Sequence, residues 1–120
     1  MELTKAETKV IMVIWETDHD MALPEILEKV NSRYQKDWKP QTVSTFLTRL
    51  VKKGFLNMYR QGRSFLYHPC FSQDQVLRGI LMEMASVWFR GDCQLLLRKA
   101  ETFLLGGGPL QDEAGSEEGK

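Results

Sequence analysis

The sequence is poor in cysteine. Cys70 and Cys93 are the only two cysteines among 120 residues, and they stand far apart, with neither CxxC nor CxC spacing. Such spacing argues against a disulfide framework and supplies no ligand set for a dedicated zinc or copper site. We therefore expect reduced thiols that serve packing, with Cys93 packed at the start of a helix. We expect neither a metal nor a cofactor.

Long apolar runs are also absent. No stretch approaches the roughly 20 apolar residues of a membrane span, and Glu2, Lys5 and Glu7 place charges where a signal peptide needs an apolar run. We therefore expect a soluble, cytoplasmic protein without membrane association. With 42% hydrophobic residues, the chain can bury one compact core and a small dependent subdomain.

No arrangement of residues typical of catalysis is visible. The chain has no Ser/His/Asp set, no paired-carboxylate spacing and no glycine-rich phosphate loop after a strand. His19 and His68 are isolated histidines, which more often serve structure than catalysis or metal binding. We therefore expect that the protein is not an enzyme and has no catalytic residues.

Acidic residues are missing from the middle third of the chain. Asp and Glu do not occur between Trp38 and Gln73, whereas six cations do: Lys39, Arg49, Lys52, Lys53, Arg60 and Arg63. The net charge of the whole chain is zero because the last fifteen residues carry a net charge of minus three. The neutral total therefore conceals a basic centre, which is compatible with a nucleic-acid partner.

Capping and periodicity predict three helices in the first half of the chain. Thr4 and Glu7 have the spacing of a capping box, which predicts a helix over about 5–16. Pro24 suits the first position of a second helix, which should end before Asn31-Ser32. Pro40 opens a third helix, whose apolar stripe before Gly54 is the clearest of the chain: Val43, Phe46, Leu47, Leu50 and Val51.

A β-hairpin and two more helices are expected to follow. The aromatic-rich runs 55–60 and 63–68 predict two strands joined by a two-residue turn, Gln61-Gly62. Ser72 and Gln75 form a second capping box, and the helix that they open should end at Gly91-Asp92. A last helix should run over about 93–105.

Three helices followed directly by a hairpin form the order of a winged helix-turn-helix domain. In that fold the third helix enters the major groove of DNA and the hairpin lies along the backbone. The expected fold class is therefore mainly α with a small β-hairpin. We expect a winged helix-turn-helix DNA-binding domain over residues 1–70, a helical dimerisation region over 71–105 and a disordered acidic tail over 106–120.

The DNA-binding residues are expected on the outer face of the third helix and on the hairpin. Short Thr, Ser and Gln side chains suit contacts with base edges, whereas Lys and Arg suit phosphates. At the N-cap, Lys39 opposes the helix dipole, a cost that a nearby phosphate would reverse. The predicted set is Lys39, Gln41, Thr42, Ser44, Thr45, Thr48, Arg49, Lys52, Arg60 and Arg63.

The last two helices carry more apolar surface than such a pair can bury against each other, which predicts a homodimer. Two reading helices held about 34 Å apart would match successive major grooves of a palindromic operator. The predicted dimerisation residues are Val76, Ile80, Leu81, Met84, Trp88, Leu95, Leu96, Phe103 and Leu104.

Several stretches of the chain also match a known pattern. These are the run from Gln35 to Val43, the run from Thr48 to Leu56, the opening helix from Ala6 to Trp15 and the hairpin from Gly62 to Tyr67. Over about residues 3–90, and without a gap, they resemble the penicillinase and methicillin-resistance repressors. The resemblance implies a dimeric winged-helix repressor of resistance or stress genes, which binds a dyad operator commonly built on TACA and TGTA half-sites. It also implies a regulatory protease as a partner.

The chain departs from that family's pattern in three places. Lys39 stands where a Ser usually precedes the proline of the reading helix, which changes the N-cap. The Asn-Phe pair cleaved in antibiotic-responsive members falls at Lys99-Ala100, and the cysteine motif of the copper-responsive branch is missing. Neither known route of induction is therefore supported by the sequence. The glycine-rich acidic tail replaces a third C-terminal helix, which points to a smaller or looser dimer.

Two functions from different classes are open at this stage. The leading interpretation is a sequence-specific transcriptional repressor that binds its operator as a homodimer. The other is a winged-helix protein-interaction module that has lost operator recognition. The intact set of Thr42, Thr45, Arg49 and Lys52 favours the repressor.

Overall fold

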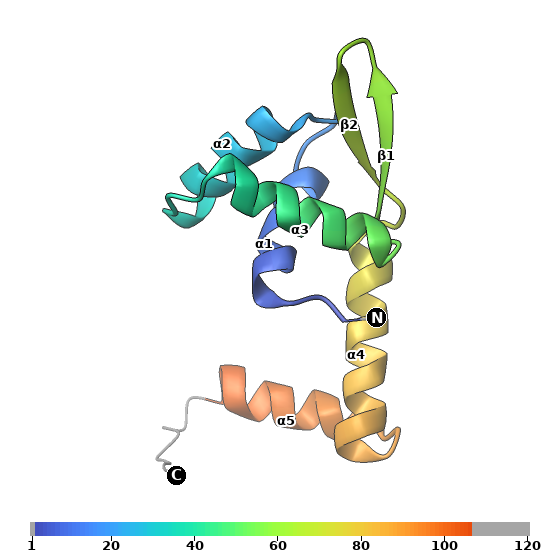
Figure 1. Cartoon of the computed structure of the whole chain (residues 1–120). Helices are drawn as coiled ribbons and strands as arrows, with labels where there is room; N and C mark the ends of the chain where they lie inside the picture. Colours follow the sequence, from blue (N-terminus) through green and yellow to red (C-terminus); the bar gives the residue numbers. More distant parts are fainter. Residues whose placement is uncertain (1, 107–120) are drawn as a thin grey trace. The chain divides into compact units, whose positions relative to one another are not determined.

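The computed structural model, drawn in Figure 1, describes residues 2–106. The chain forms two compact units that divide after Val76. The first unit holds helices and strands in the order α1 (Lys5–Trp15), α2 (Leu23–Tyr34), α3 (Pro40–Lys52), β1 (Leu56–Gln61) and β2 (Ser64–Pro69). Helix α4 (Gln73–Phe89) begins there and continues in the second unit, which also holds α5 (Cys93–Leu105). This order confirms the predicted fold class. Apart from Gly106, the predicted disordered tail lies outside the described residues.

Helix α1 begins with the predicted capping box. The Thr4 hydroxyl accepts a hydrogen bond from the Glu7 amide at 3.1 Å, and the Glu7 carboxylate accepts one from the Thr4 amide at 3.0 Å. Two amides that the helix itself leaves without a partner are thereby satisfied. Local sequence is therefore enough to fix where α1 begins.

Helix α2 is longer than the sequence predicted. It does not end before Asn31-Ser32 but continues to Tyr34 and stops at Gln35, whose φ of 51° is left-handed. The side chain of Asn31 holds the following loop instead, because its amide donates to the Trp38 carbonyl at 3.1 Å and accepts from the Trp38 amide at 2.9 Å. A residue that looked like a helix terminator thus fixes the approach to α3.

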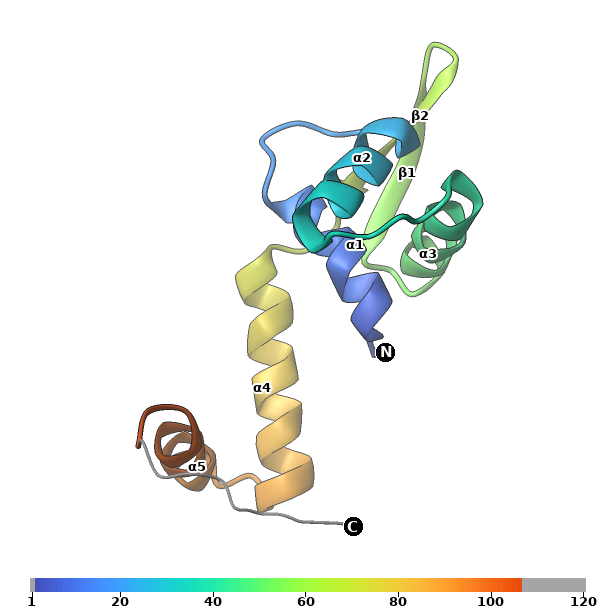
Figure 2. The ribbon, with the colours of Figure 1, turned by 90° about the vertical axis from the view of Figure 1, so that its left-hand side faces the viewer.

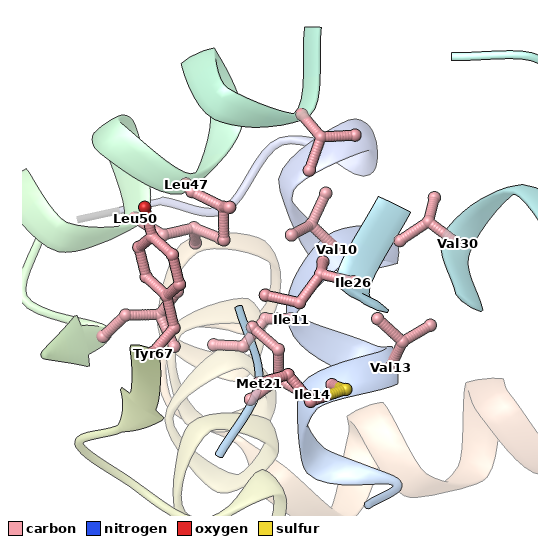
Figure 3. Close-up of a cluster of buried hydrophobic side chains, with 12 residues drawn as sticks. Val10, Ile11, Val13, Ile14, Met21, Ile26, Val30, Leu47, Leu50 and Tyr67 are labelled. Carbon is pink, nitrogen blue, oxygen red and sulfur yellow. The ribbon is translucent and has the colours of Figure 1, made fainter. Parts of the chain in front are cut away.

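The three helices and the base of the hairpin enclose one hydrophobic core (Figure 3). Side chains from α3 pack there against those of α1 and α2. Burial of one large apolar side chain stabilises a fold by about 1.5–3 kcal/mol. With its apolar stripe in this core, α3 must turn its opposite face outward. The core residues are Val10, Ile11, Val13, Ile14, Met21, Ile26, Val30, Val43, Leu47, Leu50, Leu56 and Tyr67.

The hairpin forms where expected, but its turn lies one residue later. Leu56 pairs with Pro69 at the base and Gln61 with Ser64 at the tip, so the two loop residues are Gly62 and Arg63, not Gln61 and Gly62. Gly62 has a φ of 63°, which a type II′ turn requires at its first loop position. In both ribbon views the turn extends beyond the three helices of its unit (Figures 1 and 2).

The second unit consists of α4 from Leu77 onward and α5, separated by the predicted break at Gly91-Asp92. The Asp92 carboxylate caps α5 by accepting a hydrogen bond from the Leu95 amide at 3.0 Å. Helix α5 turns away from the axis of α4 and does not run back along it (Figures 1 and 2). Among residues 2–106, no helix is long and apolar enough to cross a membrane.

The prediction of packed thiols is wrong. Cys70 and Cys93 are both exposed. Cys93 is the first residue of α5, a helix in which no residue is buried.

Candidate nucleic-acid interface

The predicted base-reading residues share the outer face of α3. Its inner face is fixed by the full burial of Val43, Leu47 and Leu50. On a helix with 100° per residue, the opposite side collects polar residues only, of which Thr42, Ser44 and Thr45 are half-buried. The structure thus brings together Gln41, Thr42, Ser44, Thr45, Thr48, Arg49 and Lys52.

Two hydroxyls of this face are already committed as donors. Thr45 donates to the Gln41 carbonyl at 3.0 Å, and Thr48 donates to the Ser44 carbonyl at 2.9 Å. Each hydroxyl has a single hydrogen, so toward a ligand Thr45 and Thr48 present an acceptor oxygen and a methyl group. These groups match the exocyclic amines of adenine or cytosine and the methyl group of thymine.

The cations at the end of α3 face solvent. Arg49 and Lys52 are exposed and form no ion pair with the carboxylates of the described residues. The Arg49 guanidinium lies 5.9 Å from the centre of the Phe46 ring, within the range of a cation–π contact. Both positive charges are therefore available to a polyanion.

Lys39 stands at the N-cap of α3, as predicted, and provides no side-chain cap. Its ammonium group lies 3.6 Å from the Asp37 carboxylate, in a pair that is exposed on both sides. An exposed pair of this kind is weak. The positive charge of Lys39 is thus only weakly paired within the chain.

Lys53 does not belong to the exposed basic surface, although it lies in the acid-free segment. Its ammonium group donates to the Glu7 carboxylate at 2.6 Å and to the Glu2 carbonyl at 2.7 Å. Glu7 is completely buried. Lys53 is therefore part of an internal ion pair, which sequence alone could not reveal because its partner lies 46 residues away.

The hairpin carries the other two predicted cations, and the structure holds them differently. The Nε of Arg60 donates to the Gly62 carbonyl at 3.1 Å, and its guanidinium lies 5.8 Å from the centre of the Phe65 ring. Phe65 is the direct cross-strand partner of Arg60. Arg63, in the turn, has no side-chain hydrogen bond or ion pair within residues 2–106.

Both strands of the hairpin are hydrogen-bonded to the loop between α1 and α2. One Asp20 oxygen accepts a hydrogen bond from the Tyr59 hydroxyl at 2.5 Å, and the other lies 2.8 Å from Nδ1 of His68. The Tyr59 and His68 contacts lower the pKa of Asp20, and the same carboxylate raises the pKa of Tyr59. The Tyr67 amide adds a bond to the Met21 carbonyl at 3.0 Å.

The two histidines are not isolated in the structure. His68 is held by Asp20, while His19 lies 2.7 Å from Glu25 and 3.3 Å from Asp18. The Glu25 and Asp18 hydrogen bonds raise the pKa of His19. Within residues 2–106 no group of three or more His, Cys, Asp or Glu residues is arranged to hold a metal ion.

The predicted dimerisation residues lie in an apolar stripe along α4 and on α5. The stripe combines four predicted residues, Ile80, Leu81, Met84 and Trp88, with two exposed residues outside the predicted set, Leu77 and Val87. Their side chains are 40% to 74% exposed. On α5, Phe103 and Leu104 are also exposed, whereas Val76, Leu95 and Leu96 are half-buried.

Comparison with known proteins begins with a family profile described as penicillinase repressor, which matches residues 3–102. The methicillin resistance regulatory protein MecI of Staphylococcus aureus (strain N315) is 33% identical over 75 residues, or 62% of this chain and 58% of MecI. The penicillinase repressor of Bacillus licheniformis is 35% identical over 68 residues, or 57% of this chain and 51% of that protein. The chain thus spans little more than half the length of these curated relatives.

A solved structure extends the comparison to architecture. The solution structure of the Bacillus licheniformis BlaI monomeric form in complex with the blaP half-operator has a TM-score of 0.52 and 32% sequence identity. The match covers 62% of this chain and 87% of that chain. It supports the winged-helix fold that the order of helices and strands predicted.

Proposed function

Because the chain belongs to the penicillinase repressor family, we propose that it is a transcriptional repressor that binds a dyad-symmetric operator as a homodimer. One observation carries the proposal. The outer face of α3 is polar and basic, and its cations Arg49 and Lys52 have no acidic partner among the described residues. The BlaI half-operator complex, whose protein is 32% identical to this chain, supports the choice of double-stranded DNA as the partner.

The two kinds of side chain on α3 divide the work. Gln41, Thr42 and Thr45 stand near the start of the helix, where helix-turn-helix proteins contact base edges. The remaining polar and basic groups, Lys39, Ser44, Thr48, Arg49 and Lys52, surround them and suit phosphate or water-mediated contacts. The hairpin arginines extend this basic surface along the backbone.

The proposed homodimer rests on the apolar stripe of α4. Six apolar residues from Leu77 to Trp88 lie on one side of the helix, and the described part of the chain leaves them 40% to 74% exposed. Contiguous apolar surface of this kind marks an interaction site in a soluble protein. A second copy presents the same stripe by symmetry, so two chains can cover each other.

The setting of this activity follows from its partner. A repressor acts on DNA, so we propose that the protein works in the cytoplasm and controls resistance or stress genes, as the family suggests. We keep a regulatory protease as a proposed partner. The site at which it would cut is not the family's Asn-Phe pair, because Lys99-Ala100 stands there.

A mobility-shift titration tests the proposal. The chain should shift a duplex with a TACA/TGTA dyad at concentrations that leave a scrambled duplex of equal length and composition free. Its affinity should fall with salt, with a slope of about −0.9 for each phosphate neutralised. Equal affinity for both duplexes would contradict sequence-specific recognition. No shift of either duplex at low salt would favour the protein-interaction module.

A further inference from the structure

The hairpin carries two arginines, Arg60 and Arg63, whose side chains differ in how they are held by the rest of the chain. Arg60 is held at two points: its Nε donates to the Gly62 carbonyl, and its guanidinium carbon lies over the Phe65 ring, 5.8 Å from the ring centre. Arg63 has neither kind of contact within residues 2–106. This difference bears on DNA binding, so the inference drawn from it rests on the proposed function.

The attachment of Arg60 leaves a defined binding group. With Nε occupied, the guanidinium keeps four N–H donors on its two terminal nitrogens. These donors form the end of the planar fork, which matches two oxygens of one phosphate. The contact that remains is therefore end-on and directional.

The platform behind Arg60 is also fixed. Arg60 and Phe65 face each other across the two strands, and Gly62 lies in the turn that joins them. The loop between α1 and α2 holds both strands: Asp20 bonds Tyr59 of β1 and His68 of β2, and the Met21 carbonyl accepts a hydrogen bond from the Tyr67 amide. All of these residues belong to the unit that contains α3. The position of the Arg60 fork relative to the reading helix is thus set before any ligand binds.

We propose that Arg60 is the preorganised phosphate-binding residue of the hairpin and that Phe65 is its positioning residue. A long side chain that is already ordered loses less conformational entropy on binding than a free one. Arg63, in contrast, contributes an adaptable charge that a lysine can replace. The two arginines, which the sequence treats alike, thereby have different roles.

Charge-conserving variants separate the two roles. Arg60→Lys keeps the charge but loses the fork and the Nε–H that bonds the Gly62 carbonyl, so Kd for the dyad duplex should rise about fivefold, as expected when one side chain must be ordered on binding. The slope of affinity against salt should not change, because the number of charges is the same. Arg63→Lys is the matched control and should change Kd less than twofold.

A second pair of measurements tests the positioning role of Phe65. Phe65→Leu removes the ring but keeps an apolar side chain, and it should weaken binding without changing the salt slope. In the free protein, the Nε–H of Arg60 should exchange with solvent more slowly than that of Arg63 by NMR, and Phe65→Leu should remove this difference. The NMR measurement does not depend on DNA or on its sequence.

The outcomes distinguish this inference from the function on which it rests. Wild-type chain that binds no DNA would overturn the repressor and, with it, the phosphate contact. Wild-type binding with equal losses for Arg60→Lys and Arg63→Lys would overturn the inference alone. Equal exchange of the two Nε–H groups in the free protein would also overturn it, whatever the affinities.

Discussion

The carboxylate of Glu7 accepts a 2.6 Å hydrogen bond from the ammonium group of Lys53, which links the first turn of α1 to the end of α3. Glu7 is fully buried, whereas the side chain of Lys53 is 24% exposed. Burial alone would raise the pKa of Glu7, but the hydrogen bonds from Lys53 and Thr4 lower it below its ordinary value. The pair therefore holds a charged carboxylate inside the domain and fixes one end of the proposed reading helix.

Removing one partner of this pair should destabilise the domain. Lys53→Met leaves the buried carboxylate without its cation, and we expect a loss of about 3 kcal/mol in the free energy of unfolding, measured by urea denaturation. The double variant Glu7→Leu/Lys53→Met should be closer to wild type than Lys53→Met, because neither charge is left unpaired. The single variant Glu7→Leu completes the cycle. If the double variant loses as much free energy of unfolding as Glu7→Leu and Lys53→Met combined, the two residues are not coupled.

The same pair predicts a dependence of stability on pH. Since the pKa of Glu7 is lowered on folding from its ordinary value of 4.5, its contribution is complete above that value and is lost as the pH falls through the folded-state pKa. The free energy of unfolding should therefore decline below about pH 4.5, and less steeply in Glu7→Gln. If the free energy of unfolding fell equally steeply with decreasing pH in wild type and in Glu7→Gln, this role of Glu7 would be contradicted.

Local signals predicted most of the elements of the fold. Thr4 and Glu7 fixed the start of α1, Pro40 that of α3, and α5 spans the predicted residues because Asp92 caps it. The hairpin turn was misplaced by one residue because a glycine in a two-residue turn can stand first or second. Its place depends on the turn type, which here puts Gly62 first.

The contacts that organise the candidate site were beyond sequence reasoning because they join distant segments. In the sequence, Lys53 resembles the other cations of the acid-free segment. In the structure it forms an ion pair with Glu7 and is therefore not part of the exposed basic surface. Asp20 lay in an unremarkable loop, yet it holds both strands of the hairpin. The difference between Arg60 and Arg63 depends on a cross-strand neighbour, which in turn depends on the register of the strands.

Lys39 at the N-cap of α3 should show opposite effects on stability and DNA affinity. Lys39→Ser supplies the missing side-chain cap, and we expect it to stabilise the domain by about 1 kcal/mol in urea denaturation. If Lys39 contacts a phosphate, the same change should weaken DNA binding and reduce the salt slope by about 0.9. A variant that is more stable but binds with unchanged slope would remove Lys39 from the interface.

Thr45 should contribute to base recognition, because it stands near the start of α3 with its hydroxyl fixed as an acceptor. Thr45→Ala removes this oxygen and the methyl group, and we expect the preference for the dyad over the scrambled duplex to fall about fivefold, equivalent to about 1 kcal/mol. Thr8→Ala in α1 is the matched control, since Thr8 donates the same kind of bond to the Thr4 carbonyl. An unchanged preference in Thr45→Ala would contradict the assignment.

The apolar stripe of α4 should hold two copies of the chain together. Met84 belongs to the stripe, whereas Met82, two residues earlier and also exposed, lies on the other side of the helix. Met84→Asp would bury a carboxylate in the proposed interface, which is costly without a partner. In sedimentation equilibrium at micromolar concentration, wild type and Met82→Asp should have twice the 13.9 kDa mass of the chain, and Met84→Asp should be monomeric.

Operator binding should weaken together with dimerisation, because a monomer reaches only one half-site. A monomeric wild type would exclude the dimer. Dissociation by both variants would show that the interface is not confined to the stripe.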